Sequence, residues 1–200
     1  MSNPAAIDSL TDDAVVRQAK TNREAFGRLY DLHYPLIFRY CSRRLLARAA
    51  AEDTTSEVFL QIARQMANFP GETLTDFRCW AYRIAANAVN AVLRKQHRQQ
   101  ELLEEATVAG RFARTELSPE AAAADAADWA EVAQALAELE PREQTVVTLR
   151  YMQGLPYEEI GRVVEAKAAT VRVILSRALE RLRRRLNTNP AGAMSDGGNP

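Results

Sequence analysis

The sequence has few cysteines, no long apolar run and no net charge, and each of these shortages limits what the protein can be. Two cysteines, Cys41 and Cys79, stand far apart among 200 residues. A disulfide scaffold or a metal site needs more ligands at closer spacing, so we expect two buried free thiols. No segment approaches the roughly 18 consecutive apolar residues of a membrane span, and the N-terminus has no basic start followed by an apolar stretch. We therefore expect neither membrane insertion nor a secretion signal.

The sequence also lacks the alternation of apolar and polar residues that marks β-strands, whereas helical spacing recurs throughout. One helical run follows Asn22, a candidate N-cap, and another covers about 51–67. Pro35 lies inside the first run, where we expect a kink or a break. A further helix starts near Asp76, after a break at residues 68–75. These patterns predict an all-α protein.

The formal net charge of zero conceals a sorting of charge along the chain. Residues 1–98 hold 14 lysines and arginines against 10 acidic residues, and residues 141–186 hold 10 against 5. Residues 99–140, in contrast, hold 2 against 10. Two basic segments joined by an acidic one favour two modules that face a polyanion, although ordinary solvated helix surfaces could have the same composition.

The same segmentation predicts the domain organisation. The acidic segment is rich in alanine and poor in large apolar side chains, so it cannot bury enough surface to fold. We therefore predict two small helical domains, at 11–98 and 129–186, joined by a flexible acidic linker at 99–128. Residues 187–200 are rich in glycine, proline and asparagine, and we expect a disordered tail there.

Residues 155–186 have the pattern of a helix-turn-helix. Pro141 and Gly154 suit the first turn and the C-terminal end of the preceding helix. A short helix opened by Pro156, the turn EAKAA and a longer helix follow, with apolar residues on one face of each helix. Four residues of the longer helix point away from that face and could meet phosphates or base edges: Thr170, Arg172, Ser176 and Arg177. A plain helical hairpin with a solvated basic end is the alternative.

Two apolar residues, Val173 and Ile174, stand near the start of this helix, where a DNA reader usually has polar side chains. By their spacing both flank the buried face of the helix. We expect them to shift DNA reading toward Arg172, Ser176 and Arg177, or to contact thymine methyl groups. The arginines at 181 and 183–185 would extend the positive surface.

The N-terminal segment combines an irregular loop with aromatic residues and a basic helix, which is what a protein needs to hold unstacked bases. Phe77 and Trp80 recur at helical spacing, so we assign both to the core. The better candidates for DNA contact are the loop residues Asn68, Glu72 and Thr73, together with Arg83, Arg94, Lys95 and Arg98.

Several segments together resemble the extracytoplasmic-function (ECF) sigma factors of bacterial RNA polymerase, members of the sigma-70 family. AEDTTSEVFLQIARQMANF and DFRCWAYRIAANAVNAVLRK are similar to region 2 of that family. LAELEPREQTVVTLRYMQGLPYEEIGRVVEAKAATVRVILSRALERLRR is similar to region 4. The resemblance covers about 11–98 and 129–186, in the family's order and with a variable linker between.

The resemblance implies a dissociable promoter-recognition subunit and a function for each segment. The AED helix would dock on core polymerase through Asp53, Glu57 and Gln61. The loop and the helix after it would open and hold the −10 element through Asn68, Glu72, Thr73, Arg83, Asn87 and Arg94. The helix-turn-helix would read the −35 element through Thr170, Arg172, Ser176 and Arg177. Such proteins act in the cytoplasm, and an anti-sigma factor commonly holds them inactive.

Four residues, at three places in the chain, depart from the family's usual residues. Ser56 stands where the family usually has glutamine in the docking helix, and Ala91 where it often has aspartate near the −10 reader. Val173 and Ile174 replace a Ser–Arg pair in the recognition helix. The apolar framework is unchanged, so these departures bear on contacts to polymerase and DNA rather than on the fold.

Two other classes of protein remain as alternatives. A stand-alone helix-turn-helix regulator would bind duplex DNA tightly without core polymerase. An enzyme would need a catalytic cluster, and its best candidates, His33 and His97, lie near no cysteine, serine or carboxylate at catalytic or metal spacing. We therefore expect no enzymatic activity, cofactor or metal.

Overall fold

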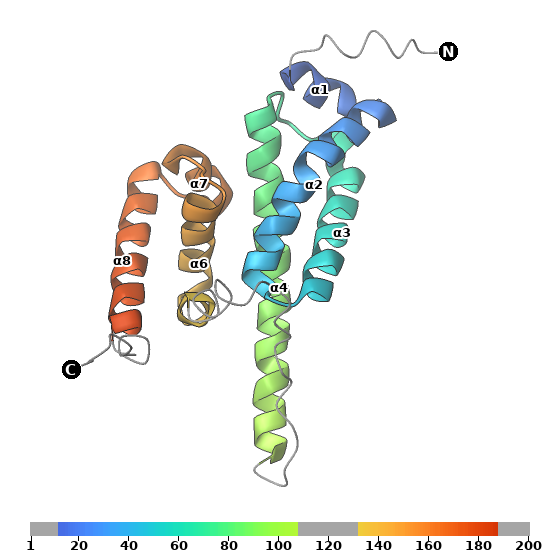
Figure 1. Cartoon of the computed structure of the whole chain (residues 1–200). Coiled ribbons are helices and arrows are strands. Elements are labelled where there is room, and N and C mark those ends of the chain that lie inside the picture. Colours follow the sequence, from blue (N-terminus) through green and yellow to red (C-terminus); the bar gives the residue numbers. More distant parts are fainter. Residues whose placement is uncertain (1–11, 108–131, 188–200) are drawn as a thin grey trace, which may run out of the picture. The chain divides into compact units, whose positions relative to one another are not determined.

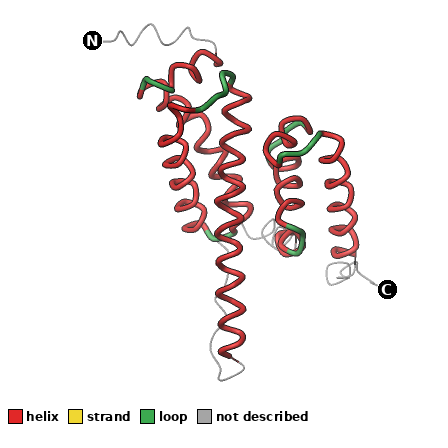
Figure 2. Tube along the Cα trace, turned by 180° about the vertical axis from the view of Figure 1, so that it is seen from behind, coloured by secondary structure: helices red, strands yellow, loops and turns green. Residues whose placement is uncertain are grey.

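The computed structural model describes residues 12–107 and 132–187, and the chain divides into two compact units. The predictions for residues 108–128 of the linker and for residues 188–200 of the tail lie outside the described residues, whereas Asn187 of the predicted tail is the last residue of a helix. The long helix of the first unit extends to Thr107, so residues 99–107 of the predicted linker are helical. Figure 2 shows the described residues as helices joined by short loops, as the sequence predicts.

The N-terminal unit is a bundle of helices. The three longer helices lie side by side, and the first, short helix packs on α2 (Figure 1). A single 3₁₀ turn, η2, follows α3 and leads into the loop before α4. The elements are α1 (Asp12–Ala19), α2 (Arg23–Leu45), α3 (Arg48–Gln65), η2 (Met66–Asn68) and α4 (Leu74–Thr107).

Local signals set the boundaries of α2. The side chain of Asn22 accepts hydrogen bonds from the backbone N–H groups of Glu24 and Ala25, at 2.8 and 3.2 Å, which confirms the predicted N-cap. Of the kink or break predicted at Pro35, a break is absent, because α2 continues through this residue. Pro35 is exposed, so the carbonyl that loses its partner can face water, and packing against α1, α3 and α4 holds the helix together.

Large side chains from all three long helices form the core. Each of them is almost fully removed from water, and burial of such a side chain contributes about 1.5–3 kcal/mol. The set includes Leu29, Ile37 and Tyr40 of α2, Val58 and Ile62 of α3, and Phe77, Tyr82 and Val89 of α4. Cys41 and Cys79 are buried free thiols, as predicted. Burial raises the pKa of Cys41 to about 11, so this thiol is unreactive at neutral pH.

The described part of the C-terminal unit starts with a helical stretch at 132–137 and continues as a compact group of helices. Pro141 is the first residue of α6, as predicted, and Gly154 has a φ of +70°, which suits glycine at the end of a helix. The helices α6 and α7 both pack on α8. The elements are α6 (Pro141–Val147), the π-helical turn η3 (Thr148–Met152), α7 (Tyr157–Val164) and α8 (Ala168–Asn187).

None of the helices within the described ranges combines the length and the apolar character that a membrane crossing requires.

Candidate nucleic-acid interface

The helix-turn-helix is built by α7, a three-residue turn and α8. Ile160 and Val163 of α7 and Val171 and Leu175 of α8 are buried between the helices. Glu165 ends α7 in the left-handed conformation, with φ of 53°, and donates its N–H to the carbonyl of Gly161. Packing of the two apolar faces therefore fixes which side of α8 remains in solvent.

That outer side carries the four predicted −35 residues, all of which are exposed: Thr170, Arg172, Ser176 and Arg177. We expected both Val173 and Ile174 to flank the buried face of α8, but only one of them does. Val173 is 49% exposed, whereas Ile174 is half-buried. Val173 therefore belongs to the outer surface of α8, and only Ile174 flanks the core.

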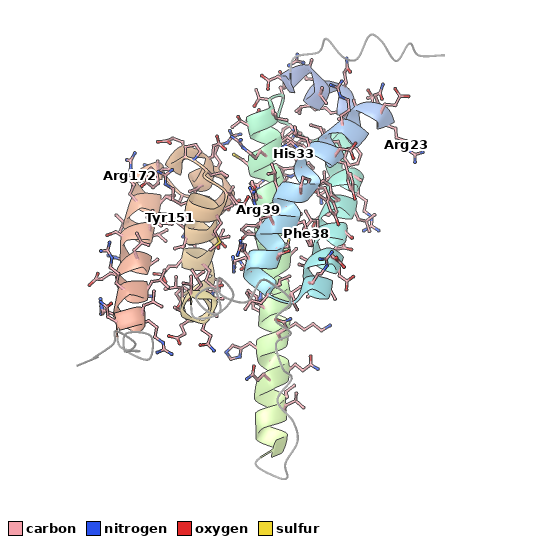
Figure 3. All side chains as sticks on the ribbon, viewed as in Figure 1. Arg23, His33, Phe38, Arg39, Tyr151 and Arg172 are labelled. Atoms are coloured by element: carbon pink, nitrogen blue, oxygen red, sulfur yellow. The ribbon has the colours of Figure 1, made fainter. Side chains whose placement is uncertain are left out.

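An aromatic ring next to α8 holds two arginines, which the sequence pattern did not reveal. The guanidinium carbon of Arg172 lies 4.9 Å from the ring centroid of Tyr157, and that of Arg150 lies 4.6 Å from it. These distances are within the range of cation–π attraction. Arg172 also approaches Glu158 at 3.9 Å, but both side chains are more than half exposed, so this ion pair contributes little. Figure 3 shows Arg172 near the N-terminal end of α8.

The arginine run at the end of α8 is used differently from the prediction. We expected it to extend the positive surface, but Arg181 pairs with Glu143 at 2.9 Å and Arg185 with Glu138 at 2.8 Å. Arg184 pairs with Glu180, one turn earlier in α8, at 2.7 Å. These partners compensate much of the positive charge of the run. The first half of α8 is therefore the better part of this helix for binding a polyanion.

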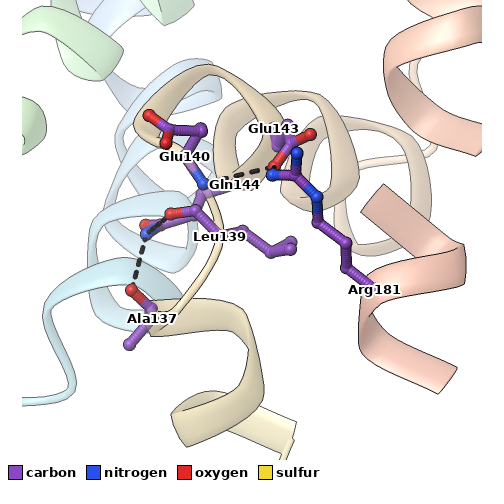
Figure 4. A network of polar contacts seen from close by, with 6 residues as sticks. All are labelled: Ala137, Leu139, Glu140, Glu143, Gln144 and Arg181. Atoms are coloured by element: carbon purple, nitrogen blue, oxygen red, sulfur yellow. Dashed lines mark hydrogen bonds and ion pairs between the residues drawn. The ribbon is translucent and has the colours of Figure 1, made fainter. Parts of the chain in front are cut away.

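The pair with Glu143 belongs to a polar network that fixes the start of α6 (Figure 4). The carboxylate of Glu143 accepts the backbone N–H of Glu140 and the guanidinium of Arg181. The side-chain amide of Gln144 donates to the carbonyls of Ala137 and Leu139. Glu143 and Gln144 are buried, so a satisfied partner avoids a desolvation cost of about 1–3 kcal/mol for each of these side chains. The network ties α8 and the preceding segment to α6.

In the N-terminal unit, the predicted polymerase-docking residues share the outer face of α3. Asp53 and Glu57 are exposed and Gln61 is half-buried, at successive spacings of four residues. Ser56 is exposed on the same side. Leu60, which the sequence reasoning missed, is 44% exposed there. The sequence could have indicated Leu60, because it is an apolar residue that falls outside the buried stripe of α3.

The predicted −10 loop ends in a hydrogen-bonded cap. The backbone N–H groups of Glu72 and Thr73 donate to a carboxylate oxygen of Asp76, at 3.2 and 3.1 Å. The hydroxyl of Thr73 accepts the N–H of Asp76, so the two residues form a reciprocal cap at the start of α4. Asp13 of α1 accepts the N–H of Leu74. Thr73 is therefore partly committed to the fold, while Asn68 and Glu72 are exposed.

Stacked aromatic side chains pack against this loop. The ring of Phe69 lies 4.5 Å from that of Trp80, with an angle of 20° between the planes, and Phe77 packs edge-on against both. Phe77 is fully buried, as predicted, and Trp80 is half-buried. A Cβ added to Gly71 would lie 2.4 Å from a ring carbon of Phe69, so only glycine fits between the loop backbone and the ring.

The remaining −10 candidates follow one side of α4. Asn87 and Arg94 are exposed and Arg83 is half-buried. Beside them, the buried Arg44 of α2 donates to the side-chain oxygen of Asn90 at 3.0 Å. Asn90 therefore joins α2 to α4.

The histidines do not form a catalytic centre. Nδ1 of His33 donates to the carbonyl of Leu29 at 3.0 Å, and its ring packs edge-on against Phe77. Burial lowers the pKa of His33, which is the behaviour of a core histidine. His97 is exposed on α4. Across residues 12–107 and 132–187, no three histidine, cysteine or acidic side chains are grouped as a metal site.

Comparison with known proteins assigns both units. The family model of sigma-70 region 2 matches residues 29–99, and that of sigma-70 region 4 matches residues 129–182. The RNA polymerase sigma-H factor of Pseudomonas aeruginosa is 31% identical over 172 residues, which cover 83% of this chain and 88% of that protein. The ECF RNA polymerase sigma factor BldN of Streptomyces coelicolor is 32% identical over 179 residues, or 87% of this chain. The match spans 65% of the length of BldN.

A solved structure has the same fold. The sigma factor RpoE from Bartonella quintana, in complex with the anti-sigma factor NepR, aligns with a TM-score of 0.62 at 20% identity. The alignment covers 82% of this chain and 98% of RpoE. With regions 2 and 4 both matched in order, and with relatives that are themselves sigma factors, the chain belongs to the ECF group of the sigma-70 family of RNA polymerase sigma factors.

Proposed function

We propose that this protein is an alternative sigma factor that binds core RNA polymerase and directs promoter-specific initiation in the cytoplasm. One observation carries the proposal: a single chain has a region-2 bundle followed by a region-4 helix-turn-helix whose outer face is polar and basic. A stand-alone regulator would need only the second unit, so the comparisons do not favour that alternative. The relatives are named as sigma factors, which are not catalytic enzymes.

Core polymerase would dock on the outer face of α3. Asp53, Glu57 and Gln61 supply acidic and amide groups there, and the exposed Leu60 adds an apolar contact. A mixed surface of this kind suits a partner with basic residues around an apolar side chain. The smaller Ser56 would reduce the polar contact in the middle of this face.

The −10 element would be opened and held by the loop before α4 and by one side of that helix. Asn68 and Glu72 are free to reach bases, and Arg83, Asn87 and Arg94 would follow the strand. Thr73 would act mainly as the cap that holds the loop in shape. The rigid Phe69–Trp80 stack beneath the loop would keep its residues in position while a base is extruded.

The −35 element would be read by the first half of α8 in the major groove. Arg172 and Arg177 would contact guanine or phosphate, and Thr170 at the helix start suits a phosphate. Residues 11–98 and 129–186 would be the two functional domains and 99–128 their linker. An anti-sigma factor would hold the protein inactive; RpoE, whose fold is the same, is bound to the anti-sigma factor NepR in its solved structure.

Promoter-dependent transcription with purified core enzyme tests the proposal. The chain and core polymerase are incubated with a random pool of promoter-length DNA, and transcribed templates are recovered and sequenced. We expect enrichment of two conserved elements and at least a tenfold loss for Arg177→Ala. Arg184→Ala is the matched control, because this arginine is paired within its own helix. Transcription no greater than that of core enzyme alone would contradict the proposal.

A further inference from the structure

The first half of α8 and the preceding α6–α7 connection meet at one ring, that of Tyr157. Two guanidinium groups lie over it, that of Arg150 at 4.6 Å and that of Arg172 at 4.9 Å from the centroid. Tyr157 is half-buried, so the fold fixes the position of its ring while part of the ring remains accessible from solvent. The three residues come from η3, α7 and α8 and are brought together only by the tertiary structure.

The backbone of the α6–α7 connection places Arg150 against this ring. The π-helical turn η3 carries Arg150, and π-turns are rare features that often occur at functional sites. The N–H of Leu155 donates to the carbonyl of Leu149 at 3.0 Å, which folds the connection back on itself. Arg150 in turn donates to the carbonyl of Leu155 at 3.1 Å. Arg150 is therefore anchored at two points, by this carbonyl and by the ring.

Arg172 has weaker supports, and the ring is the main one. Its ion pair with Glu158 is 3.9 Å long, and the side chain is 58% exposed. An unsupported arginine at this exposure samples many rotamers, and ordering it upon DNA binding costs entropy. Contact with the ring of Tyr157 already restricts the rotamers of Arg172 in the free protein, so less entropy is lost when DNA binds. The neighbouring guanidinium of Arg150 also raises the positive electrostatic potential around Arg172. The negative phosphates of bound DNA would neutralise part of this charge.

We propose that Tyr157 is a positioning residue for DNA reading. Its aromatic face holds Arg172 in the orientation in which this arginine meets the −35 DNA, and Arg150 is the second cation of the same cluster. The inference rests on the proposed sigma-factor function. The ring, rather than the phenol hydroxyl, carries this role. Tyr157→Phe should therefore keep it and Tyr157→Leu should lose it.

The first arm of the test uses the free, full-length protein. Protons of the Arg172 side chain should show ring-current shifts in NMR spectra, and its Nε–Hε group should be ordered. We expect both properties to remain in Tyr157→Phe and to be lost in Tyr157→Leu. Tyr151→Leu is the matched control, because Tyr151 lies in the same connection, is 60% exposed and lies under no guanidinium group within residues 12–107 and 132–187. Unchanged Arg172 signals in Tyr157→Leu would overturn the inference.

The second arm measures binding of the holoenzyme to the promoter selected by the wild-type protein. We expect Tyr157→Leu to lose two- to fivefold in affinity, about 0.4 to 1 kcal/mol at 1.4 kcal/mol per tenfold. Preference for the selected −35 sequence over a scrambled one should fall with it. The loss should largely vanish in an Arg172→Ala background, since the ring then has nothing to position. Tyr157→Phe should bind within twofold of wild type.

The possible outcomes distinguish a failure of this inference from a failure of the proposed sigma-factor function. If the wild-type holoenzyme selects no DNA, the sigma-factor function fails and the inference fails with it. If the wild type selects DNA but Tyr157→Leu binds equally well, only the inference fails. Equal losses in the leucine and phenylalanine variants would assign the role to the hydroxyl, as a direct DNA contact, and would also overturn it. Thermal melting of each variant shows whether the C-terminal unit remains folded.

Discussion

Alanine substitution of two helical glycines should have opposite effects on stability. Gly27 lies in α2 and Gly161 in α7. A Cβ added at Gly27 meets no atom within 4 Å, whereas one added at Gly161 would lie 2.5 Å from the backbone carbonyl oxygen of Ala166. Helix propensity alone favours alanine over glycine by about 0.8–1 kcal/mol at either position. Only the steric environment distinguishes them.

The steric term should exceed the propensity term at Gly161. Ordinary carbon–oxygen contacts are about 3.3–3.6 Å long, so roughly 0.8 Å of movement is needed. The obstacle is backbone, and the carbonyl of Gly161 accepts the N–H groups of both Glu165 and Ala166, which hold the turn in place. Overpacking costs about 1–3 kcal/mol. Gly161→Ala should therefore destabilise the C-terminal unit by about 1 kcal/mol net, and Gly27→Ala should stabilise the N-terminal unit by about 0.5–1 kcal/mol.

Hydrogen exchange followed by mass spectrometry measures each unit separately in the full-length chain. Slowly exchanging amides of α8 should exchange about fivefold faster in Gly161→Ala, because 1.4 kcal/mol corresponds to a tenfold change in the opening equilibrium. Amides of α2 and α3 should exchange more slowly in Gly27→Ala. Slower exchange of α8 in Gly161→Ala would refute the steric reasoning. It would show that the turn yields at little cost and that propensity decides the sign.

Three packed positions outside this turn should also respond in defined ways. Glu143→Gln removes the charge that holds Arg181, and urea denaturation should show a loss of about 1–2 kcal/mol; a loss near zero would contradict the role of this ion pair. Burial lowers the pKa of His33 below 6.5, so the unfolded chain binds more protons and the free energy of unfolding should fall as the pH drops below 6.5. His33→Gln should flatten that pH dependence, whereas substitution of the exposed His97 should leave it. Gly71→Ala should impair promoter melting, detected by permanganate reactivity, more than duplex binding, because the added Cβ would lie 2.4 Å from the supporting phenylalanine ring. Normal melting in that variant would argue against a rigid loop.

The sequence predicted features that depend on neighbours within about four residues. Asn22 caps α2 and Pro141 opens α6, because a cap needs only a side chain and the nearest free N–H groups. The outward position of Thr170 and Arg172 followed from helical period and the apolar stripe of α8. The sequence did not indicate that α2 continues through Pro35, because helix propensity cannot report the packing that holds α2 together.

By itself, the sequence determined the helical class, the order of the two units and the outward position of the polar residues of α8, since periodicity and capping act over short distances. Only the tertiary structure decided how the arginines are used. Arg181 reaches Glu143 across 38 residues, and Arg44 reaches Asn90 across 46. Arg172 rests on the ring of Tyr157. Whether a charged side chain is paired within the fold or presented to DNA depends on which helices pack together. That choice is made by burial of apolar faces over the whole unit, and no local pattern contains it.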